Sequence, residues 1–272
     1  ADAEITEGWL RHFERIGSRL IVRSRTKVTT QVIAAGRNLK VIGRAGVGVD
    51  NIDVAAALAA GITVVNSPLA ATVAVAELTV GMMLDLARRV PAADAVLKRG
   101  KWEKSAFMGD ELAGKTLGLV GFGRIGAEVA RRARAFDMSI VAHDPYLSDD
   151  QIRERGAEPK AFTDLLGCAD YVSLHLPLTE GTRGMFDTVR LSQMKKGARL
   201  ICLARGGVID EAALAAALDS GQLAGAALDV FAVEPPGPGS IAEHPKVVAT
   251  PHIGAQTREG QDRAGLDIAS EV

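Results

Sequence analysis

Short apolar runs alternate with helical patterns along almost the whole chain. Most of these runs are apolar on both faces, which is typical of buried parallel strands joined by crossover helices. The predicted strands are Arg19–Arg23, Lys40–Arg44, Ile62–Val65, Thr116–Val120, Ser139–His143, Tyr171–His175, Arg199–Leu203, Gly225–Asp229 and Val247–Thr250. The pattern therefore predicts an α/β fold with a doubly wound parallel sheet.

Helical periodicity and end signals mark three of the helices. An apolar pattern predicts a long helix over Thr72–Arg89, between the first three strands and the other six. A second helical pattern runs from Arg124 to Phe136. A third begins at Glu211, with Asp210 as its N-cap and Gly221 as its stop. Because the long helix separates two groups of strands, we expect two domains.

Composition narrows the class of protein. The chain has 272 residues, 47% hydrophobic and 24% charged, with a net charge of −1, so no basic field favours nucleic acid or an anionic membrane. Gly61 and Pro68 interrupt the uncharged stretch Val54–Ala76, which argues against a membrane span. Cys168 and Cys202 lack metal-ligand spacing, so we expect free thiols, no metal site and a cytoplasmic location.

A glycine-rich loop, GFGRIG at 121–126, follows the strand Thr116–Val120 directly and leads into a helical pattern. In a dinucleotide site, Gly121 would permit the tight turn and Gly123 the approach of a pyrophosphate, while Gly126 would let helix and strand pack closely. The N–H groups of the first helical turn would bind the phosphates. GxGxxG alone is weak evidence, but strand, loop and helix together are the context such a site needs.

Asp144 ends the next predicted strand, 18 residues after Gly126. A carboxylate at this place accepts hydrogen bonds from the adenosine ribose and repels a 2′-phosphate, which favours NAD over NADP. The alternative interpretation is an aspartate that only starts a turn before Pro145. With the glycine loop beside it, Asp144 indicates a Rossmann domain that binds NAD.

Charged residues follow three later strands, in the stretches ARGGVIDE, ALDVFAVEPP and ATPHIGAQT. These stretches contain Arg205, Asp229 with Glu234, and His252. Ligands of open α/β sheets bind outside the carboxyl ends of the strands, so all four side chains are expected at one crevice. Each alone could be structural, as a strand-capping arginine, a solvated acid or a packed histidine. Together they indicate a reaction site.

The chain resembles the D-isomer-specific 2-hydroxyacid dehydrogenases from about Leu20 onward. The matching text is LIVRSRTKVT, VIGRAGVGVDNID, AELTVGMML, GKWEKSAFMG, GKTLGLVGFGRIG, ARGGVIDE, AGAALDVFAVEPP and TPHIGAQT. The resemblance implies that His252 is the proton acceptor, Glu234 its orienting partner, Arg205 the substrate anchor and Asp229 the acceptor for the nicotinamide carboxamide. It implies further cofactor contacts from Val47, Arg124, Ile125, Leu176, Leu203, Ala204, Arg205, His252 and Gly254.

These roles agree with the chemistry of alcohol oxidation. The hydroxyl proton needs a base while a hydride leaves for nicotinamide, and histidine is suited to that task near neutral pH. A carboxylate beside the imidazole fixes its tautomer and stabilises its protonated form. Arginine can bind a substrate carboxylate with two parallel hydrogen bonds.

Two arginines suggest the substrate. Arg23 and Arg44 end adjacent predicted strands and flank the glycine loop Gly46, Val47 and Gly48, whose N–H groups would bind the substrate carboxylate. This set suits a substrate that is anionic at both ends. GKWEKSAFMG and VIGRAG point, by resemblance, to a branch of the family that oxidises 3-phosphoglycerate to 3-phosphohydroxypyruvate at the entry to serine synthesis.

Two alternatives stay open. Within the class, the reaction could be the reduction of glyoxylate, hydroxypyruvate or another 2-hydroxyacid partner; formate oxidation is disfavoured because that branch lacks the glutamate beside its histidine. From another class, an NAD-sensing binding protein similar to transcriptional corepressors can keep Arg205, Glu234 and His252 without catalysis.

The resemblance also predicts the domains. An NAD-binding domain is expected at 67–257 and a smaller, flavodoxin-like substrate domain at 1–66 plus 258–272, with the active site in a cleft between them. Relatives have a further strand and helix before their first matching strand, whereas here only a helical stretch, roughly Ile5–Ile16, precedes it. We therefore expect a substrate domain truncated at the N-terminus, in a chain that starts at Ala1 of a longer protein.

A homodimer or higher homo-oligomer is expected from the middle of the chain. Trp102 and Phe107 stand among lysines in GKWEKSAFMG, where an exposed aromatic has no role in a monomer. The preceding helix, Thr72–Arg89, carries small residues that allow close packing, namely Ala74, Ala76 and Gly81. Local core packing is the alternative.

Overall fold

The computed structural model describes residues 18–272, and the helical stretch expected at Ile5–Ile16 lies outside them. The chain divides into two compact units. One consists of Ala1–Ala74 with Ala255–Val272, and the other is Val75–Gly254.

The first unit contains, among its described residues, a three-stranded parallel sheet of order β1-β2-β3. The strands are β1 (Arg19–Val22), β2 (Val41–Arg44) and β3 (Thr63–Asn66), and the helices are α2 (Thr30–Ala35), α3 (Val54–Ala59) and α11 (Arg258–Glu271). The register pairs Val22 with Arg44 and Arg44 with Asn66, so the three strands end side by side. The end of α11 packs on this sheet so closely that a Cβ on Gly43 would lie 2.5 Å from Val272.

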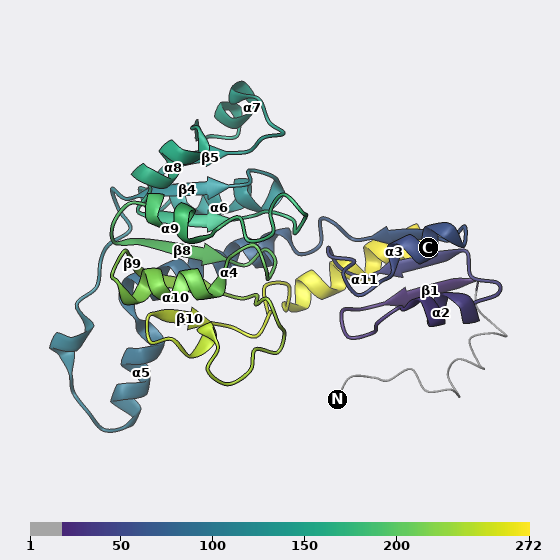
Figure 1. The fold of residues 1–272 in the computed structure, drawn as a ribbon, viewed down its shortest axis with the longest axis horizontal. Helices are drawn as coiled ribbons and strands as arrows, with labels where there is room; N and C mark the ends of the chain where they lie inside the picture. Colours follow the sequence, from purple (N-terminus) through teal and green to yellow (C-terminus); the bar gives the residue numbers. More distant parts are fainter. Residues whose placement is uncertain (1–17) are drawn as a thin grey trace. The chain divides into compact units, whose positions relative to one another are not determined.

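The second unit is built on a seven-stranded parallel sheet of order β10-β9-β8-β7-β4-β5-β6 (Figure 1). Its strands are β4 (Thr116–Val120), β5 (Ser139–His143), β6 (Glu158–Pro159), β7 (Tyr171–Leu174), β8 (Ala198–Cys202), β9 (Leu223–Leu228) and β10 (Val247–Ala249). The helices and 3₁₀ turns are α4 (Thr72–Arg88), which begins in the first unit, α5 (Val90–Lys98), η1 (Lys104–Phe107), α6 (Arg124–Arg134), α7 (Asp149–Glu154), α8 (Phe162–Cys168), α9 (Thr188–Gln193), α10 (Glu211–Asp219) and η2 (Ile241–Glu243).

Helices cover both faces of the larger sheet. All four residues of β7 are buried, as expected for a central strand of a doubly wound sheet. α6 and α8 both pack against β4 and β5. Gly118 of β4 lets α8 approach, since a Cβ there would lie 2.6 Å from Leu165. The predicted doubly wound α/β fold is confirmed.

Most element bounds agree with the prediction to within two residues. Asp210 caps α10 as predicted, because its carboxylate accepts hydrogen bonds from Ala212 N at 3.0 Å and Ala213 N at 3.1 Å. The predicted helix Thr72–Arg89 stops one residue early, because Arg89 adopts a left-handed conformation with φ 54° and the chain turns into α5.

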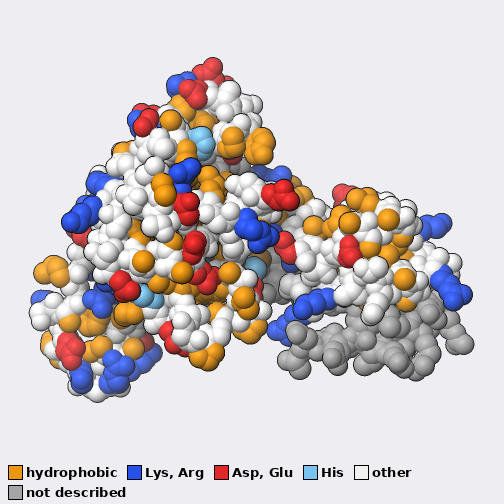
Figure 2. Space-filling model, viewed as in Figure 1, with side chains coloured by type: hydrophobic (Ala, Val, Ile, Leu, Met, Phe, Trp, Pro, Cys, Tyr) orange, Lys and Arg blue, Asp and Glu red, His pale blue; other side chains and the backbone are white. Residues whose placement is uncertain are grey.

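The helix α5 has no buried residue. Val90, Leu97, Trp102 and Met108, on this helix and in the loop after it, are exposed large hydrophobic residues. Figure 2 shows hydrophobic side chains beside Lys and Arg over this part of the second unit, at the lower left. In the part of the chain that the structure describes, no helix is both long and apolar enough to span a bilayer.

Candidate active site

The strand ends of the second unit gather most of the predicted site residues. All seven strands are parallel, so their carboxyl ends share one edge of the sheet. The residues that follow these ends include Gly121, Asp144, Leu176, Leu203, Ala204, Arg205, Asp229 and His252. Segments far apart in sequence meet there: a Cβ on Gly121 would lie 2.5 Å from the carbonyl oxygen of His175 and 3.3 Å from Leu176.

The glycine loop has the geometry that a dinucleotide needs. Gly121 has φ 88°, which favours glycine, and a Cβ on Gly126 would lie 2.6 Å from the carbonyl oxygen of Gly121. A Cβ on Gly123 would meet nothing within 4 Å, so the backbone there is open on its outer side. α6 begins at Arg124, followed by Ile125, and presents its first N–H groups at this point. These features fit the pyrophosphate of NAD.

Asp144 lies against the glycine loop. Its Oδ2 accepts a hydrogen bond from Phe122 N at 2.8 Å, and its Oδ1 accepts one from Tyr146 N at 2.9 Å. The second contact is the turn expected of an Asp-Pro pair, and the first sets the carboxylate beside the loop, where the proposed ribose contact requires it. Sequence reasoning missed Arg155, whose Nη1 donates to Phe122 O at 2.9 Å. Arg155 has no motif around it that places it at the loop.

His252 and Glu234 form a hydrogen-bonded pair. Nδ1 of His252 lies 2.7 Å from Oε2 of Glu234, which leaves Nε2 of the imidazole for another partner. Both side chains are accessible, with 52% of His252 and 36% of Glu234 exposed. The backbone of His252 is left-handed, with φ 52°, which is unusual outside glycine. The two side chains that the resemblance pairs are thus in hydrogen-bond contact.

Asp229 holds the turn that carries His252. Its side chain is 1% exposed. Its Oδ1 accepts hydrogen bonds from Thr250 Oγ1 at 2.6 Å and Ile253 N at 2.8 Å, and its Oδ2 accepts one from Gly254 N at 2.8 Å. A buried carboxylate with several donors is well satisfied without leaving the interior. Thr250 was not singled out from the sequence, although its hydroxyl adjoins the strand end.

Arg205 stands on a loop that is pressed against the segment leading to Glu234. A Cβ on Gly206 would lie 1.8 Å from the carbonyl oxygen of Phe231, so only glycine fits. Arg205 is half-buried, and its Nη1 donates to Ala204 O at 2.7 Å. Beneath it, burial raises the pKa of the Cys202 thiol to about 11, which keeps that sulfur unreactive.

His175 is a further polar group at this edge. Its Nε2 lies 3.0 Å from Ser173 Oγ, and desolvation by burial lowers the pKa of the imidazole to about 4. The histidine is therefore neutral at physiological pH. Sequence reasoning missed it, although its place directly after a buried strand was a usable signal.

The predicted substrate loop lies in the first unit. Gly46 has φ 141°, and a Cβ there would lie 1.5 Å from Arg44 Nη1, so the guanidinium covers the loop. That same nitrogen donates to Ala45 O at 3.2 Å. The loop is fixed by Ser67 N, which donates to Gly46 O at 3.0 Å, and by Asn66 Nδ2, which donates to Val47 O at 2.5 Å.

Arg23 and Gly48 complete the predicted substrate set. Arg23 is exposed and follows β1 directly, so the register that pairs Val22 with Arg44 sets the two arginines on neighbouring strand ends. Gly48 is half-buried, two residues after Gly46 in the same loop. The adjacency that the sequence predicted is present within this unit.

A glycine loop opening a helix at the head of a parallel sheet, with a carboxylate on the next strand end, defines a dinucleotide-binding domain. A paired histidine and glutamate at the same edge are the groups that acid–base chemistry requires. Residues 80–254 match the model of the D-isomer specific 2-hydroxyacid dehydrogenase family, NAD binding domain. The chain belongs to this family, and its second unit contains that NAD-binding domain.

Individual relatives narrow the comparison. The chain is 51% identical over 255 residues to D-3-phosphoglycerate dehydrogenase 2, chloroplastic, of Arabidopsis thaliana, with 93% of this chain and 41% of that protein covered. It is 47% identical over 253 residues to D-3-phosphoglycerate dehydrogenase of Bacillus subtilis, with 93% and 48% covered. The chain thus spans less than half the length of these curated relatives.

One solved structure can be compared directly with the fold of this chain. D-lactate dehydrogenase from Aquifex aeolicus, solved with NAD and lactic acid, is similar with a TM-score of 0.84 at 30% identity. The match covers 96% of this chain and 83% of that one. A protein named for D-lactate thus shares the architecture of this chain.

Proposed function

We propose that the protein oxidises 3-phosphoglycerate to 3-phosphohydroxypyruvate with NAD, the reaction that opens serine synthesis. The observation that carries the proposal is the pair of His252 and Glu234, 2.7 Å apart at the strand edge where the glycine loop also lies. Relatives about half identical to this chain are named D-3-phosphoglycerate dehydrogenases, which supports the choice of substrate.

The cofactor would be held by the strand-end residues of the second unit. The glycine loop with Arg124 and Ile125 would bind the pyrophosphate, and Asp144 the adenosine ribose. The other proposed contacts in this unit are Leu176, Leu203, Ala204, Arg205, Asp229, His252 and Gly254, and Val47 of the first unit is proposed as well. NAD supplies the acceptor for the hydride that leaves the substrate carbon.

The protein's own residues would manage the proton and the charges. Nε2 of His252 accepts the hydroxyl proton, because Nδ1 is engaged by Glu234. The carboxylate of Glu234 stabilises the imidazolium that forms. Arg205, with Gly46, Val47 and Gly48, binds the substrate carboxylate.

The phosphate is assigned to Arg23 and Arg44. Changing Arg44→Ala should raise KM for 3-phosphoglycerate about 10- to 100-fold, because a charge-assisted hydrogen bond is worth about 1.5–3 kcal/mol. KM for unphosphorylated 2-hydroxy acids should stay nearly constant. Arg37→Ala is the control, since Arg37 is exposed before the opposite end of β2. An equal loss on both kinds of substrate would assign Arg44 to the fold of its loop instead.

A substrate panel followed by NADH absorbance tests the function as a whole. We expect turnover with 3-phosphoglycerate in preference to D-lactate, D-glycerate or the reverse reactions of glyoxylate and hydroxypyruvate. Preference for glyoxylate or hydroxypyruvate would move the protein to another branch of the family. Tight NADH binding without any turnover would favour the regulatory NAD-sensing protein.

We also propose that 67–257 is the NAD-binding domain and that 1–66 with 258–272 forms the flavodoxin-like substrate domain. A homodimer is proposed from the exposed apolar side chains around α5. Cytoplasmic location is supported by the free thiols Cys168 and Cys202.

A further inference from the structure

Glu234 is carried by an exposed loop after β9, and its orientation depends on what fixes that loop. Its own Oε1 accepts a hydrogen bond from Phe231 N at 3.1 Å, within the loop. A second carboxylate reaches the same segment from outside: Glu211 Oε1 accepts from Ala232 N at 2.6 Å. The two carboxylates thus accept hydrogen bonds from two successive backbone N–H groups.

Glu211 is attached to a rigid support. It is the first residue of α10 and is half-buried. The same helix buries Ala213, Leu214, Ala217 and Leu218 in the core of the second unit. On the other side of the segment, the backbone of Gly206 lies against Phe231 O. The backbone at 231–232 is therefore held between a core helix and the loop that carries Arg205.

We propose that Glu211 is a positioning residue for the acid–base pair: by holding Ala232 N it keeps Glu234 aimed at Nδ1 of His252. This inference rests on the proposed function. Without the hydrogen bond from Ala232 N to Glu211, the loop stays attached to β9. Glu234 then spends less time within 2.7 Å of the imidazole. The protonated histidine then loses part of its stabilising charge.

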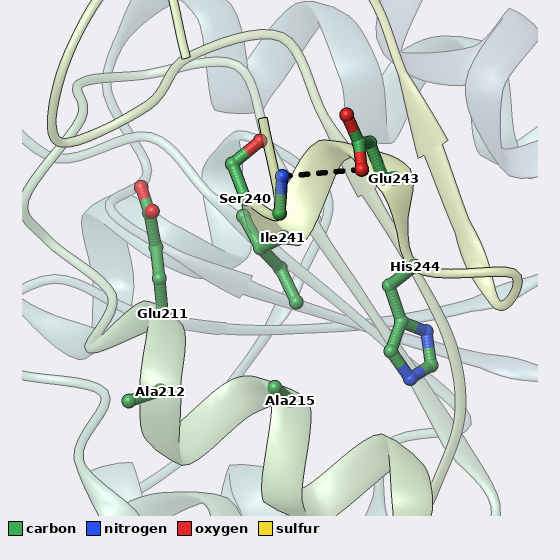
Figure 3. A pocket seen from close by; sticks show the side chains of 8 residues that line it. Glu211, Ala212, Ala215, Ser240, Ile241, Glu243 and His244 are labelled. Carbon is green, nitrogen blue, oxygen red and sulfur yellow. Dashed lines mark hydrogen bonds between the residues drawn. The ribbon is translucent and has the colours of Figure 1, made fainter. Parts of the chain in front are cut away.

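A neighbouring glutamate offers a matched control. Figure 3 shows Glu211 on one side of a surface pocket and Glu243 on the other, above α10. Glu243 Oε2 also accepts from a backbone N–H, that of Gly239 at 3.2 Å. Glu211 and Glu243 have the same side chain, line the same pocket and make the same kind of contact. They differ in the segment that they hold, because Gly239 lies outside the segment 231–234.

The test compares three single variants, Glu211→Ala, Glu211→Gln and Glu243→Ala, with the wild-type protein. Glu211→Ala should lower kcat for 3-phosphoglycerate oxidation about 10- to 100-fold, the effect expected of a small misplacement at a reaction site, with KM for NAD nearly unchanged. The acidic limb of its pH–rate profile should move to lower pH. Glu211→Gln keeps an acceptor oxygen and should restore most of the rate, while Glu243→Ala should match the wild type.

A second measurement does not depend on turnover. The ring-proton resonances of His252, recorded by NMR at one pH, should move in Glu211→Ala and keep their wild-type positions in Glu243→Ala, because only the first change loosens the contact with Glu234. If the wild type shows no turnover, the proposed function fails and the NMR comparison still tests Glu211. Unchanged His252 resonances with an unchanged pH profile in Glu211→Ala, or an equal effect of Glu243→Ala, would overturn the inference.

Discussion

His252 combines a strained backbone conformation with an exposed side chain. A non-glycine residue in the left-handed region costs about 1–3 kcal/mol, and His252 has φ 52°. The three hydrogen bonds from Thr250, Ile253 and Gly254 to the buried Asp229 offset that cost. The imidazole is thus fixed from its backbone, while its Nδ1 is fixed by Glu234. This double attachment is what the proposed base requires in order to meet a substrate in one orientation.

Substitution of the pair should separate catalysis from binding. His252→Ala should lower kcat by about 10²–10⁴-fold, the usual worth of general base catalysis, with little change in NAD affinity. Glu234→Gln should move the acidic limb of the pH–rate profile to lower pH, because the charge that stabilises the imidazolium is lost. Steady-state kinetics over a pH series measures both effects. An identical profile in Glu234→Gln would show that the two side chains do not act together.

His175 should make stability depend on pH. Burial lowers its pKa to about 4 in the folded state, from 6.5 in an exposed chain. The unfolded state then binds more protons between these values, so this contribution is complete above pH 6.5 and is lost as the pH falls toward 4. We expect the free energy of unfolding to fall by up to about 2 kcal/mol from pH 7 to pH 5 on this account. Urea unfolding should show a smaller fall in His175→Gln; an equal fall would contradict the assignment.

At the scale of elements, the apolar pattern predicted the strands whose residues are buried. β4 and β5 agree residue for residue with the prediction, because the apolar and small residues 117–120 of β4 and 140–142 of β5 are all buried. β6, with two residues at the sheet edge, leaves no such pattern and was missed. α5 was also missed, since it buries nothing.

The residues of the candidate site likewise fall into those that the sequence could predict and those that it could not. Residues inside motifs, such as Arg205, Glu234 and His252, could be named from the sequence because strand ends of a parallel sheet share one edge. The hydrogen bond from Ala232 N to Glu211 joins residues 21 apart in the sequence. It depends on tertiary packing, which no local pattern encodes. The same holds for Arg155, which reaches Phe122 over 33 residues.

We expect the glycine loop and Asp144, which follows β5, to determine the choice of cofactor together. Asp144 should make NAD strongly preferred, since a carboxylate bound to Phe122 N repels a 2′-phosphate in a partly desolvated site. Asp144→Ala should narrow the ratio of kcat/KM for NAD to that for NADP. Asp149→Ala, on exposed α7, is the control. Equal use of both cofactors by the wild type would mean that Asp144 serves only the turn to Tyr146.

At the scale of the whole molecule, the two units contribute different chemistry. The second unit contains the glycine loop, the acid–base pair and Arg205, whereas the first contains Arg23, Arg44 and the loop that Asn66 fixes. The proposed phosphate contacts thus reside on the first unit, whereas the proposed substrate anchor Arg205 and the proposed acid–base pair reside on the second. The proposed reaction requires both, which is why changes in Arg44 and in His252 should affect KM and kcat separately.

The surface around α5 leads to the last prediction, that of a homodimer. α5 has no buried residue, although Val90 and Leu97 are large and apolar. Trp102 is 82% exposed in the loop that follows, whereas Phe107 is half-buried under the guanidinium of Arg89, 5.2 Å from its ring centre. Ala74 and Ala76 of α4 are buried, so part of the expected contact is local core.

Several exposed apolar side chains on one helix and the loop after it are typical of a subunit interface, and closed two-fold pairing is the commonest way to cover them. Sedimentation equilibrium should therefore give twice the chain mass of 28.5 kDa, or a higher multiple. Trp102→Ala should weaken association, because burying an aromatic side chain is among the largest single contributions to an interface. Tyr146→Ala should leave association unchanged, although Tyr146 is 91% exposed, since it stands alone in a turn after β5. A wild-type mass equal to one chain would reject the homodimer and leave α5 as a solvated arm.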